Sequence, residues 1–115
     1  TLRRVGRESF ILKSKIDPLD VEKAREGFLV AKKAIEDNAY DIVILDEMNT
    51  AVDFGLVPLS DLLQLIDSKP ESVELILTGR NACPEIVEKA DLVTEMVERK
   101  HYYREGIPAR KGIEW

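Results

Sequence analysis

A short apolar run that ends in two acidic residues constrains the fold of this chain more than any other feature. The run is Ile42–Leu45, and Asp46 and Glu47 follow it directly. A strand that is apolar on both faces is typical of a parallel sheet, so we predict a central strand covered on both sides. Open parallel sheets bind ligands at the carboxyl ends of their strands. The pattern therefore predicts a binding site at Asp46 and Glu47.

An apolar strand followed by Asp-Glu is also the pattern of a Walker B segment. In nucleotide-binding proteins of that kind the acid holds Mg²⁺, directly or through water, while the metal bridges phosphate oxygens. The same residues also arise by chance at strand ends, where the acids only face water. By itself the pattern favours nucleotide chemistry and a solvated acidic edge about equally.

Length, charge and cysteine content limit the class of protein. The chain has 115 residues, which predicts a single domain, residues 1–115, large enough to bury a core. A net charge of −5 gives no reason to expect a nucleic-acid partner. We find no apolar run of membrane length and no secretory leader, so we expect no membrane partner and a cytoplasmic protein. The single cysteine, Cys83, excludes an internal disulfide.

The longest predicted helix begins at Asp17-Pro18 and runs to about Asp37. Asp is a preferred N-cap and Pro a preferred first helical residue. Residues with helical spacing form one apolar stripe that is expected to face a sheet: Val21, Ala24, Phe28, Ala31 and Ile35. Gly27 inside this helix costs about 1 kcal/mol relative to Ala, which indicates either close packing or a tolerated defect.

The remaining patterns predict alternating strands and helices. Residues 48–57 are predicted to form a loop, and a helix is predicted to begin at Pro58 and to stop at Lys69-Pro70. A second helix is predicted for residues 84–90, with Ile86 and Val87 buried. Strands are predicted for residues 9–12, 73–77 and 92–97. This order predicts the α/β class, with a mostly parallel sheet and flanking helices.

Three predicted strand ends carry polar residues that are far apart in sequence. Asp46-Glu47, residues 78–80 and Glu95 lie at or near ends of neighbouring strands and are expected to meet in one crevice. Arg80 would either bind phosphate through its planar guanidinium or pair with a surface carboxylate. Glu95 either reaches this site or faces water, and its alternation with apolar neighbours favours water.

An ordered set of motifs resembles a known family, the P-loop type of ATP:cob(I)alamin (corrinoid) adenosyltransferase. The motifs are Val-Ile-Leu-Asp-Glu-Met at 43–48, Thr-Gly-Arg at 78–80, Ala-Asp-Leu-Val-Thr-Glu-Met at 90–96 and Lys-His at 100–101, followed by Gly106-Ile107, Ala109 and Gly-Ile-Glu-Trp at 112–115. Each motif alone is weak, but together, in this order and spacing, they are specific. The resemblance covers nearly the whole chain.

The resemblance implies transfer of the 5′-deoxyadenosyl group of ATP to the cobalt of a reduced corrinoid, in cobalamin biosynthesis or salvage. It implies a P-loop NTPase (RecA-like) fold and Mg²⁺, with Glu47 as a metal ligand and Asp46 supporting it. Thr78 and Arg80 would belong to the ATP site. Phe10 would be an aromatic residue near the corrin, although a phenylalanine in the core is an equal alternative.

The sequence departs from the family pattern at two places. The family's glycine-rich phosphate loop, of the Gly-Asn-Gly-Lys-Gly-Lys-Thr kind, precedes the matched portion, and residues 1–7 offer no replacement. The predicted fold therefore lacks its N-terminal phosphate-loop unit, which would supply a strand beside Ile42–Leu45. We accordingly expect an apolar sheet edge that is exposed or covered in a homodimer. Leu12 occupies the position of a family tryptophan.

Two other functions remain open from the sequence. The chain is alternatively a non-catalytic binding or assembly module that kept the sheet but lost nucleotide chemistry. An unrelated Walker B ATPase is a third possibility, but it leaves the C-terminal motif unexplained. In that C-terminal segment, residues 99–115, we expect a looping path anchored by Ile107, Ile113 and Trp115, with His101 structural rather than a cobalt ligand.

Overall fold

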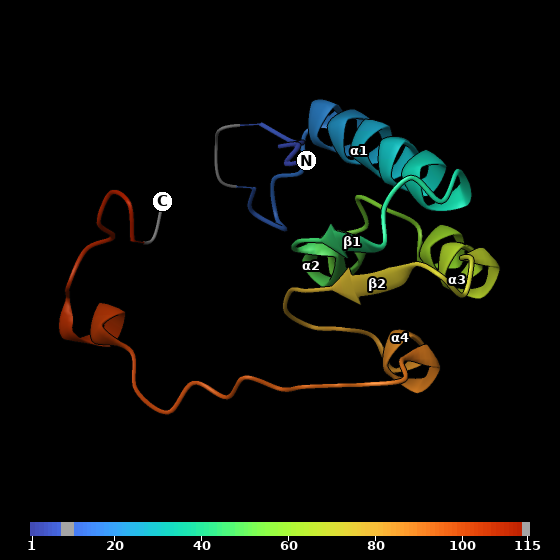
Figure 1. Cartoon of the computed structure of the whole chain (residues 1–115). Helices are drawn as coiled ribbons and strands as arrows, with labels where there is room; N and C mark the ends of the chain where they lie inside the picture. The colour runs from blue at the N-terminus through green and yellow to red at the C-terminus, as the bar shows by residue number, and fades with distance from the viewer. Residues whose placement is uncertain (8–10, 114–115) are drawn as a thin grey trace.

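The computed structural model describes residues 1–7 and 11–113 and has an α/β arrangement with a small parallel sheet (Figure 1). In chain order its elements are α1 (Pro18–Glu36), β1 (Ile42–Leu45), α2 (Met48–Asp53), α3 (Leu59–Ser68), β2 (Glu74–Leu77), α4 (Pro84–Lys89) and the 3-10 helix η1 (Tyr102–Glu105). The predicted α/β class is therefore confirmed, and five of these elements lie within a few residues of their predicted bounds.

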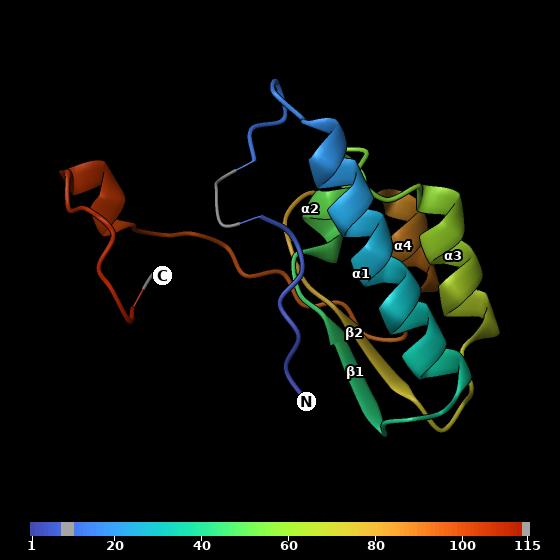
Figure 2. The same cartoon turned by 90° about the horizontal axis from the view of Figure 1, so that it is seen from above.

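The sheet consists of β1 and β2, which pair in parallel within the described residues. Val43 lies opposite Leu75 and Leu45 opposite Leu77, so these four side chains share one face. That face packs on the core, which α1, α3 and α4 complete (Figures 1 and 2). The buried residues that these three helices contribute are Phe28, Ile35, Leu62, Leu65 and Ile86, and α2 (Met48–Asp53) adds Met48.

The prediction that Ile42–Leu45 is covered on both faces is wrong for the described residues. Ile42 and Ile44 point away from the core and are 57% and 59% exposed, and Ile76 of β2 is also exposed. β1 pairs only with β2, so it lies at the edge of the sheet rather than at its centre. The apolar run therefore correctly predicted a strand but wrongly predicted cover on its second face.

Helix α1 begins where the capping residues predict. The side chain of Asp17 accepts a hydrogen bond from the N–H of Leu19 at 2.8 Å, and Asp20 accepts one from the N–H of Asp17 at 3.0 Å. This capping box stabilises a helix by about 1 kcal/mol. The predicted stripe packs on the core except for Val21, which is 39% exposed at the first turn.

Gly27 is explained by close packing rather than by tolerance of a defect. A Cβ atom at this position would lie 2.7 Å from Cγ2 of Val5 and 2.9 Å from its Cβ. The N-terminal segment therefore crosses α1 at a distance that only glycine allows.

The side chain of Arg7 ties the N-terminal segment to the start of α1. Its guanidinium donates to both carboxylate oxygens of Asp20, at 2.5 and 2.7 Å, and Asp20 is only 2% exposed. These hydrogen bonds lower the pKa of Asp20 below its ordinary value of 3.8 and raise the pKa of Arg7. The pair links residues 1–7 to the body of the protein.

This pair predicts a specific loss of stability in acid. Because the pKa of Asp20 is lower in the folded chain, the unfolded chain binds more protons, and stability rises with pH. The stabilisation that the Arg7–Asp20 pair gives to the folded chain is complete above pH 3.8, the ordinary pKa of an aspartate. It is lost as the pH falls through the lower pKa of Asp20 in the folded chain. Denaturant unfolding between pH 2 and 6 should show a shallower pH dependence for Asp20→Asn than for the natural chain. Identical pH profiles would contradict a role for the pair.

Two further predictions are wrong, one of secondary structure and one of burial. Residues 48–57 do not form a loop throughout, because α2 occupies Met48–Asp53. Met48, Ala51 and Val52 follow helical spacing and pack on the core, which explains the helix. In α4, Ile86 is buried as predicted, but Val87 is 42% exposed.

The chain after α4 contains no strand among its described residues. Residues 92–97 run away from the sheet, and Leu92 and Met96 are 85% and 95% exposed (Figure 1). Ile107 and Ile113 are exposed as well, so they do not anchor the segment as predicted. Residues 8–10 and 114–115 lie outside the described residues. Of the strand predicted for residues 9–12, only Ile11 and Leu12 are described, and they are not in a strand.

No helix within residues 1–7 and 11–113 has the length and apolar composition needed to cross a membrane.

Candidate functional site

The hydroxyl group of Thr78 joins the carboxyl ends of the two strands. It donates to Oδ1 of Asp46 at 2.6 Å and accepts the backbone N–H of Glu47 at 3.0 Å. The N–H of Thr78 donates to the carbonyl of Leu45, and its own carbonyl accepts the N–H of Asn49 at 3.0 Å. Thr78 therefore fixes the position of both acidic residues that end β1.

Thr50 plays the same part on the other side of Glu47. Its hydroxyl donates to Oε2 of Glu47 at 2.6 Å and accepts the backbone N–H of Arg80 at 3.1 Å. One hydroxyl from α2 thus orients the Glu47 carboxylate and holds the loop that follows β2. The two threonines link β1, α2 and β2 in one hydrogen-bonded network.

Three energetically unfavourable features occur in this network. Glu47 has a φ of 58°, in the left-handed region that non-glycine residues seldom occupy. Gly79 has a φ of 120°, and a Cβ there would lie 3.0 Å from the backbone N of Thr50. Asn49 is 7% exposed, and its Oδ1 is buried without a hydrogen-bond partner in the described part of the chain. Strain and unpaired buried polar groups are enriched at functional sites.

The two carboxylates suit a hard divalent cation. Asp46 and Glu47 are both exposed, and each uses one oxygen in a hydrogen bond with a threonine hydroxyl. Oδ2 of Asp46 and Oε1 of Glu47 have no hydrogen bond to a described residue. No group of three metal-ligating side chains occurs among the described residues. Two carboxylates with free oxygens are a donor set that Mg²⁺ would accept, because this ion binds one or two carboxylates and completes its shell with water and phosphate.

Arg80 is an exposed cation in the loop that follows β2. Its backbone is fixed by Thr50, its side chain is exposed, and its guanidinium pairs with no described carboxylate. The described structure therefore does not contain the ion pair between Arg80 and a surface carboxylate that was the alternative to phosphate binding. An unpaired, planar guanidinium on the loop that Thr50 holds near Glu47 suits binding of a phosphate chain.

The structure brings four of the predicted site residues to one edge of the sheet and places Glu95 away from them. Asp46, Glu47, Thr78 and Arg80 meet at one edge of the sheet, as their strand ends predict. Glu95 does not join them, because its segment forms no strand and lies exposed beyond α4. Phe10 lies outside the described residues.

Sequence reasoning missed the roles of Thr50 and Asp53. Both lie in α2, and the apolar spacing of Met48, Ala51 and Val52 was the signal that could have revealed this helix. With the helix recognised, Thr50 falls one turn after Glu47, within reach of its carboxylate. Cys83, by contrast, packs against the core.

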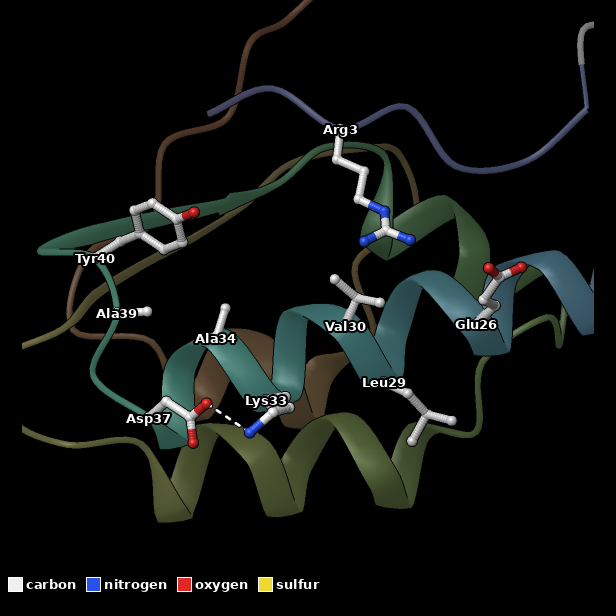
Figure 3. A pocket seen from close by; sticks show the side chains of 9 residues that line it. All are labelled: Arg3, Glu26, Leu29, Val30, Lys33, Ala34, Asp37, Ala39 and Tyr40. Carbon is white, nitrogen blue, oxygen red and sulfur yellow. Dashed lines mark hydrogen bonds and ion pairs between the residues drawn. The ribbon is translucent and has the colours of Figure 1, made fainter.

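A surface hollow lies away from this network. It has a volume of about 520 Å³ and lies between the N-terminal segment and the second half of α1 (Figure 3). Arg3, Leu29, Val30 and Tyr40 line it, with the Lys33–Asp37 ion pair at its edge. Tyr40 precedes β1, so the hollow lies at the amino end of that strand, whereas Asp46 and Glu47 lie at its carboxyl end.

Comparisons with known proteins agree with one another. Residues 1–115 match the family model described as "ATP:corrinoid adenosyltransferase BtuR/CobO/CobP". A corrinoid adenosyltransferase of Sinorhizobium sp. is 36% identical over 109 residues, which cover 94% of this chain and 51% of the relative. The corrinoid adenosyltransferase of Pseudomonas aeruginosa is 36% identical over 108 residues, or 94% and 53% of the two chains. That of Escherichia coli K12 is 33% identical over 96 residues, or 84% and 49%. The chain thus spans about half the length of the curated relatives it matches.

Proposed function

This chain belongs to the ATP:corrinoid adenosyltransferase (BtuR/CobO/CobP) family. On that premise we propose that it takes part in the transfer of the 5′-deoxyadenosyl group of ATP to the cobalt of a reduced corrinoid. The resemblance inferred from the motifs is confirmed by the family match and by relatives 33–36% identical. Because the chain spans only about half of those relatives, the activity, the substrates and the P-loop NTPase fold of the whole enzyme are proposals here.

One observation carries the proposal. Two exposed carboxylates and the backbone of Arg80 are held at the same sheet edge by two threonine hydroxyls, with donor–acceptor distances of 2.6 to 3.1 Å, and the Arg80 guanidinium pairs with no described carboxylate. Opposite charges that remain apart, each with free hydrogen-bonding capacity, suit a ligand that carries both a cation and an anion. A magnesium–triphosphate group has this character.

The residues of the site would act mainly by positioning and by neutralising charge. Glu47 and Asp46 would hold Mg²⁺, which supplies charge stabilisation on the triphosphate oxygens. Arg80 would bind the same phosphate chain through its planar fork, and Thr78 would keep Asp46 oriented. The Co(I) electron pair attacks the 5′ carbon of ATP. A cobalt–carbon bond forms, the carbon–oxygen bond breaks, and its electron pair leaves with inorganic triphosphate. Phe10 is proposed to contact the corrin.

Binding of MgATP tests the nucleotide part of this proposal. Residues 1–7 contain no glycine-rich phosphate loop, so we expect the 115-residue chain to bind MgATP weakly, with a Kd of about 1 mM. The remaining affinity should depend on the charge of Glu47 and Arg80. Calorimetry or an NMR titration of the Arg80 amide should show binding that Arg80→Ala weakens at least about fivefold.

Arg99→Ala provides the matched control, because Arg99 is an exposed arginine in the segment beyond α4. It should leave the affinity unchanged. Micromolar binding that neither Glu47→Ala nor Arg80→Ala affects would place the nucleotide elsewhere. It would favour the alternative function, a non-catalytic binding or assembly module.

A homodimer is the proposed association state of this chain. The outer edge of β1 carries four apolar residues without Lys or Pro, the usual protection of an exposed edge. No backbone hydrogen bond joins it to described residues other than those of β2 and its flanks, and Ile42, Ile44 and Ile76 form an exposed apolar face beside it. Sedimentation equilibrium should show a dimer that Ile44→Lys dissociates. A monomer at millimolar concentration would contradict this proposal.

A further inference from the structure

The carboxylate of Asp53 binds two loops that are distant in sequence. Its Oδ1 accepts a hydrogen bond from Nζ of Lys13 at 2.7 Å, and its Oδ2 accepts one from Nδ2 of Asn81 at 3.1 Å. Lys13 lies before α1 and Asn81 after β2, whereas Asp53 is the last residue of α2. Each oxygen therefore holds a different segment on the same helix end.

We call the two hydrogen bonds from Lys13 and Asn81 to Asp53 the Asp53 joint. Both of the segments that it connects have a defined local geometry, so changes in that geometry can report on the joint. Lys13 belongs to a turn closed by a hydrogen bond from the N–H of Lys15 to the carbonyl of Leu12 at 2.8 Å. Asn81 follows Arg80 directly and has a φ of 57°, in the left-handed region. The loop after β2 is thus held by α2 at two successive residues, Arg80 through Thr50 and Asn81 through Asp53.

Charge and burial favour a persistent joint. The Asp53 side chain is 23% exposed, so its interaction with Lys13 is screened less than that of a fully exposed pair. The hydrogen bond from Lys13, with a second from Asn81, holds the pKa of Asp53 below its ordinary value. The ammonium of Lys13 also lies 5.8 Å from the ring centroid of Phe54. Lys13 and Asp53 together add no net charge beside the site.

We propose that Asp53 is a positioning residue that joins the turn at residues 12–15 to the loop after β2 and so fixes the backbone from which Arg80 projects. The joint itself follows from the contacts of Asp53 alone. The role of Arg80 in binding a nucleotide phosphate rests on the proposed function.

A charge-neutral double variant, Lys13→Met with Asp53→Ala, tests the joint, because alanine leaves no acceptor for either Lys13 or Asn81. It removes the ammonium and the carboxylate together, so the net charge near an anionic ligand is unchanged. The matched control is Lys33→Met with Asp37→Ala. That pair joins Nζ and Oδ2 at 2.6 Å, also lies on the protein surface, and belongs to the C-terminal end of α1 beside the hollow (Figure 3).

Amide hydrogen exchange followed by NMR gives the first result. In the Lys13/Asp53 double variant the amides of Lys15 and Arg80 should both exchange about fivefold faster, because each loses support from Asp53. Amides in the middle of α1 should exchange as before, which excludes global destabilisation. The Lys33/Asp37 variant should change neither reporter. Unchanged exchange at Lys15, or acceleration at Arg80 alone, would overturn the joint.

Titration with MgATP gives the second result. The Lys13/Asp53 double variant should bind MgATP about fivefold more weakly than the natural chain, and the Lys33/Asp37 variant should bind it equally well. A charge-reversed pair, Lys13→Asp with Asp53→Lys, should restore affinity because the ion pair is rebuilt and the Asn81 amide can turn its oxygen to the new ammonium. Unchanged affinity alongside faster exchange would overturn the positioning role. If the natural chain shows no shift of the Arg80 amide with MgATP, the proposed function fails and the positioning role with it, while exchange still decides the joint.

Discussion

Replacing Glu47 with glutamine is expected to lower the rate of adenosyl transfer about a hundredfold or more, in a protein that joins a glycine-rich phosphate loop to this chain. The substitution removes the charge of a proposed metal ligand at nearly constant shape. The amide oxygen of glutamine can still accept the hydrogen bond that Thr50 donates to Glu47. The fold should therefore survive while the neutralisation of the departing triphosphate is lost. The measurement is the absorbance of the light-sensitive cobalt–carbon bond under strongly reducing conditions.

Two comparisons make this result interpretable. Glu71→Gln removes the same charge from an exposed residue between α3 and β2 and should leave the rate unchanged. The 115-residue chain without an added phosphate loop should not adenosylate corrinoid, because little would hold the triphosphate in line. Full activity of the Glu47→Gln protein would refute the metal role of Glu47. Corrinoid binding without any bond formation in the joined protein would favour the non-catalytic module.

Gly79→Ala is expected to lower the free energy of unfolding by about 2–3 kcal/mol. The new Cβ would lie 3.0 Å from both N and Oγ1 of Thr50 and 3.2 Å from Cα of Glu47. Two of these atoms belong to the backbone, so relief requires the strand ends to move apart. A φ of 120° adds strain for any L residue. Denaturant unfolding measures the loss, and the Arg80 amide should shift in an NMR spectrum because its bond to Thr50 changes.

Gly55→Ala separates crowding from backbone strain. Gly55 has a φ of 72°, but a Cβ there would meet nothing within 4 Å. Its substitution should cost only about 1 kcal/mol from the left-handed backbone. Equal losses for Gly55→Ala and Gly79→Ala would show that contact with Thr50 and Glu47 contributes nothing to stability.

Most of the elements could be predicted because their signals are local. Asp17-Pro18 marks the start of α1 through side-chain capping, and Lys69-Pro70 marks the end of α3. The apolar runs at β1 and β2 predict strands, and a parallel pair brings their carboxyl ends to the same edge. For that reason the sequence alone places Asp46, Glu47, Thr78 and Arg80 at one edge of the sheet.

The strand predicted at residues 92–97 failed for the opposite reason. Alternating apolar residues describe a side-chain pattern, but a strand also needs a neighbouring strand for its backbone hydrogen bonds. In the described chain these residues do not pair with β2, and Leu92 and Met96 remain exposed. The prediction that the second face of β1 is covered failed for a similar reason, because an apolar run does not specify which segment, if any, packs on that face.

Local patterns were therefore sufficient for the elements and for the edge of the sheet where the charged residues meet. The contacts that orient those residues were not predictable, because they depend on packing between segments about 30 or more residues apart. Thr78 reaches Asp46, Arg80 reaches Thr50, and Lys13 reaches Asp53 only after β1, α2 and β2 have packed together. Hydrogen bonds of this kind produce no periodic pattern in a sequence. A polar side chain that faces water and one that bonds a distant partner look alike in the sequence, because both occur at positions outside the apolar stripe.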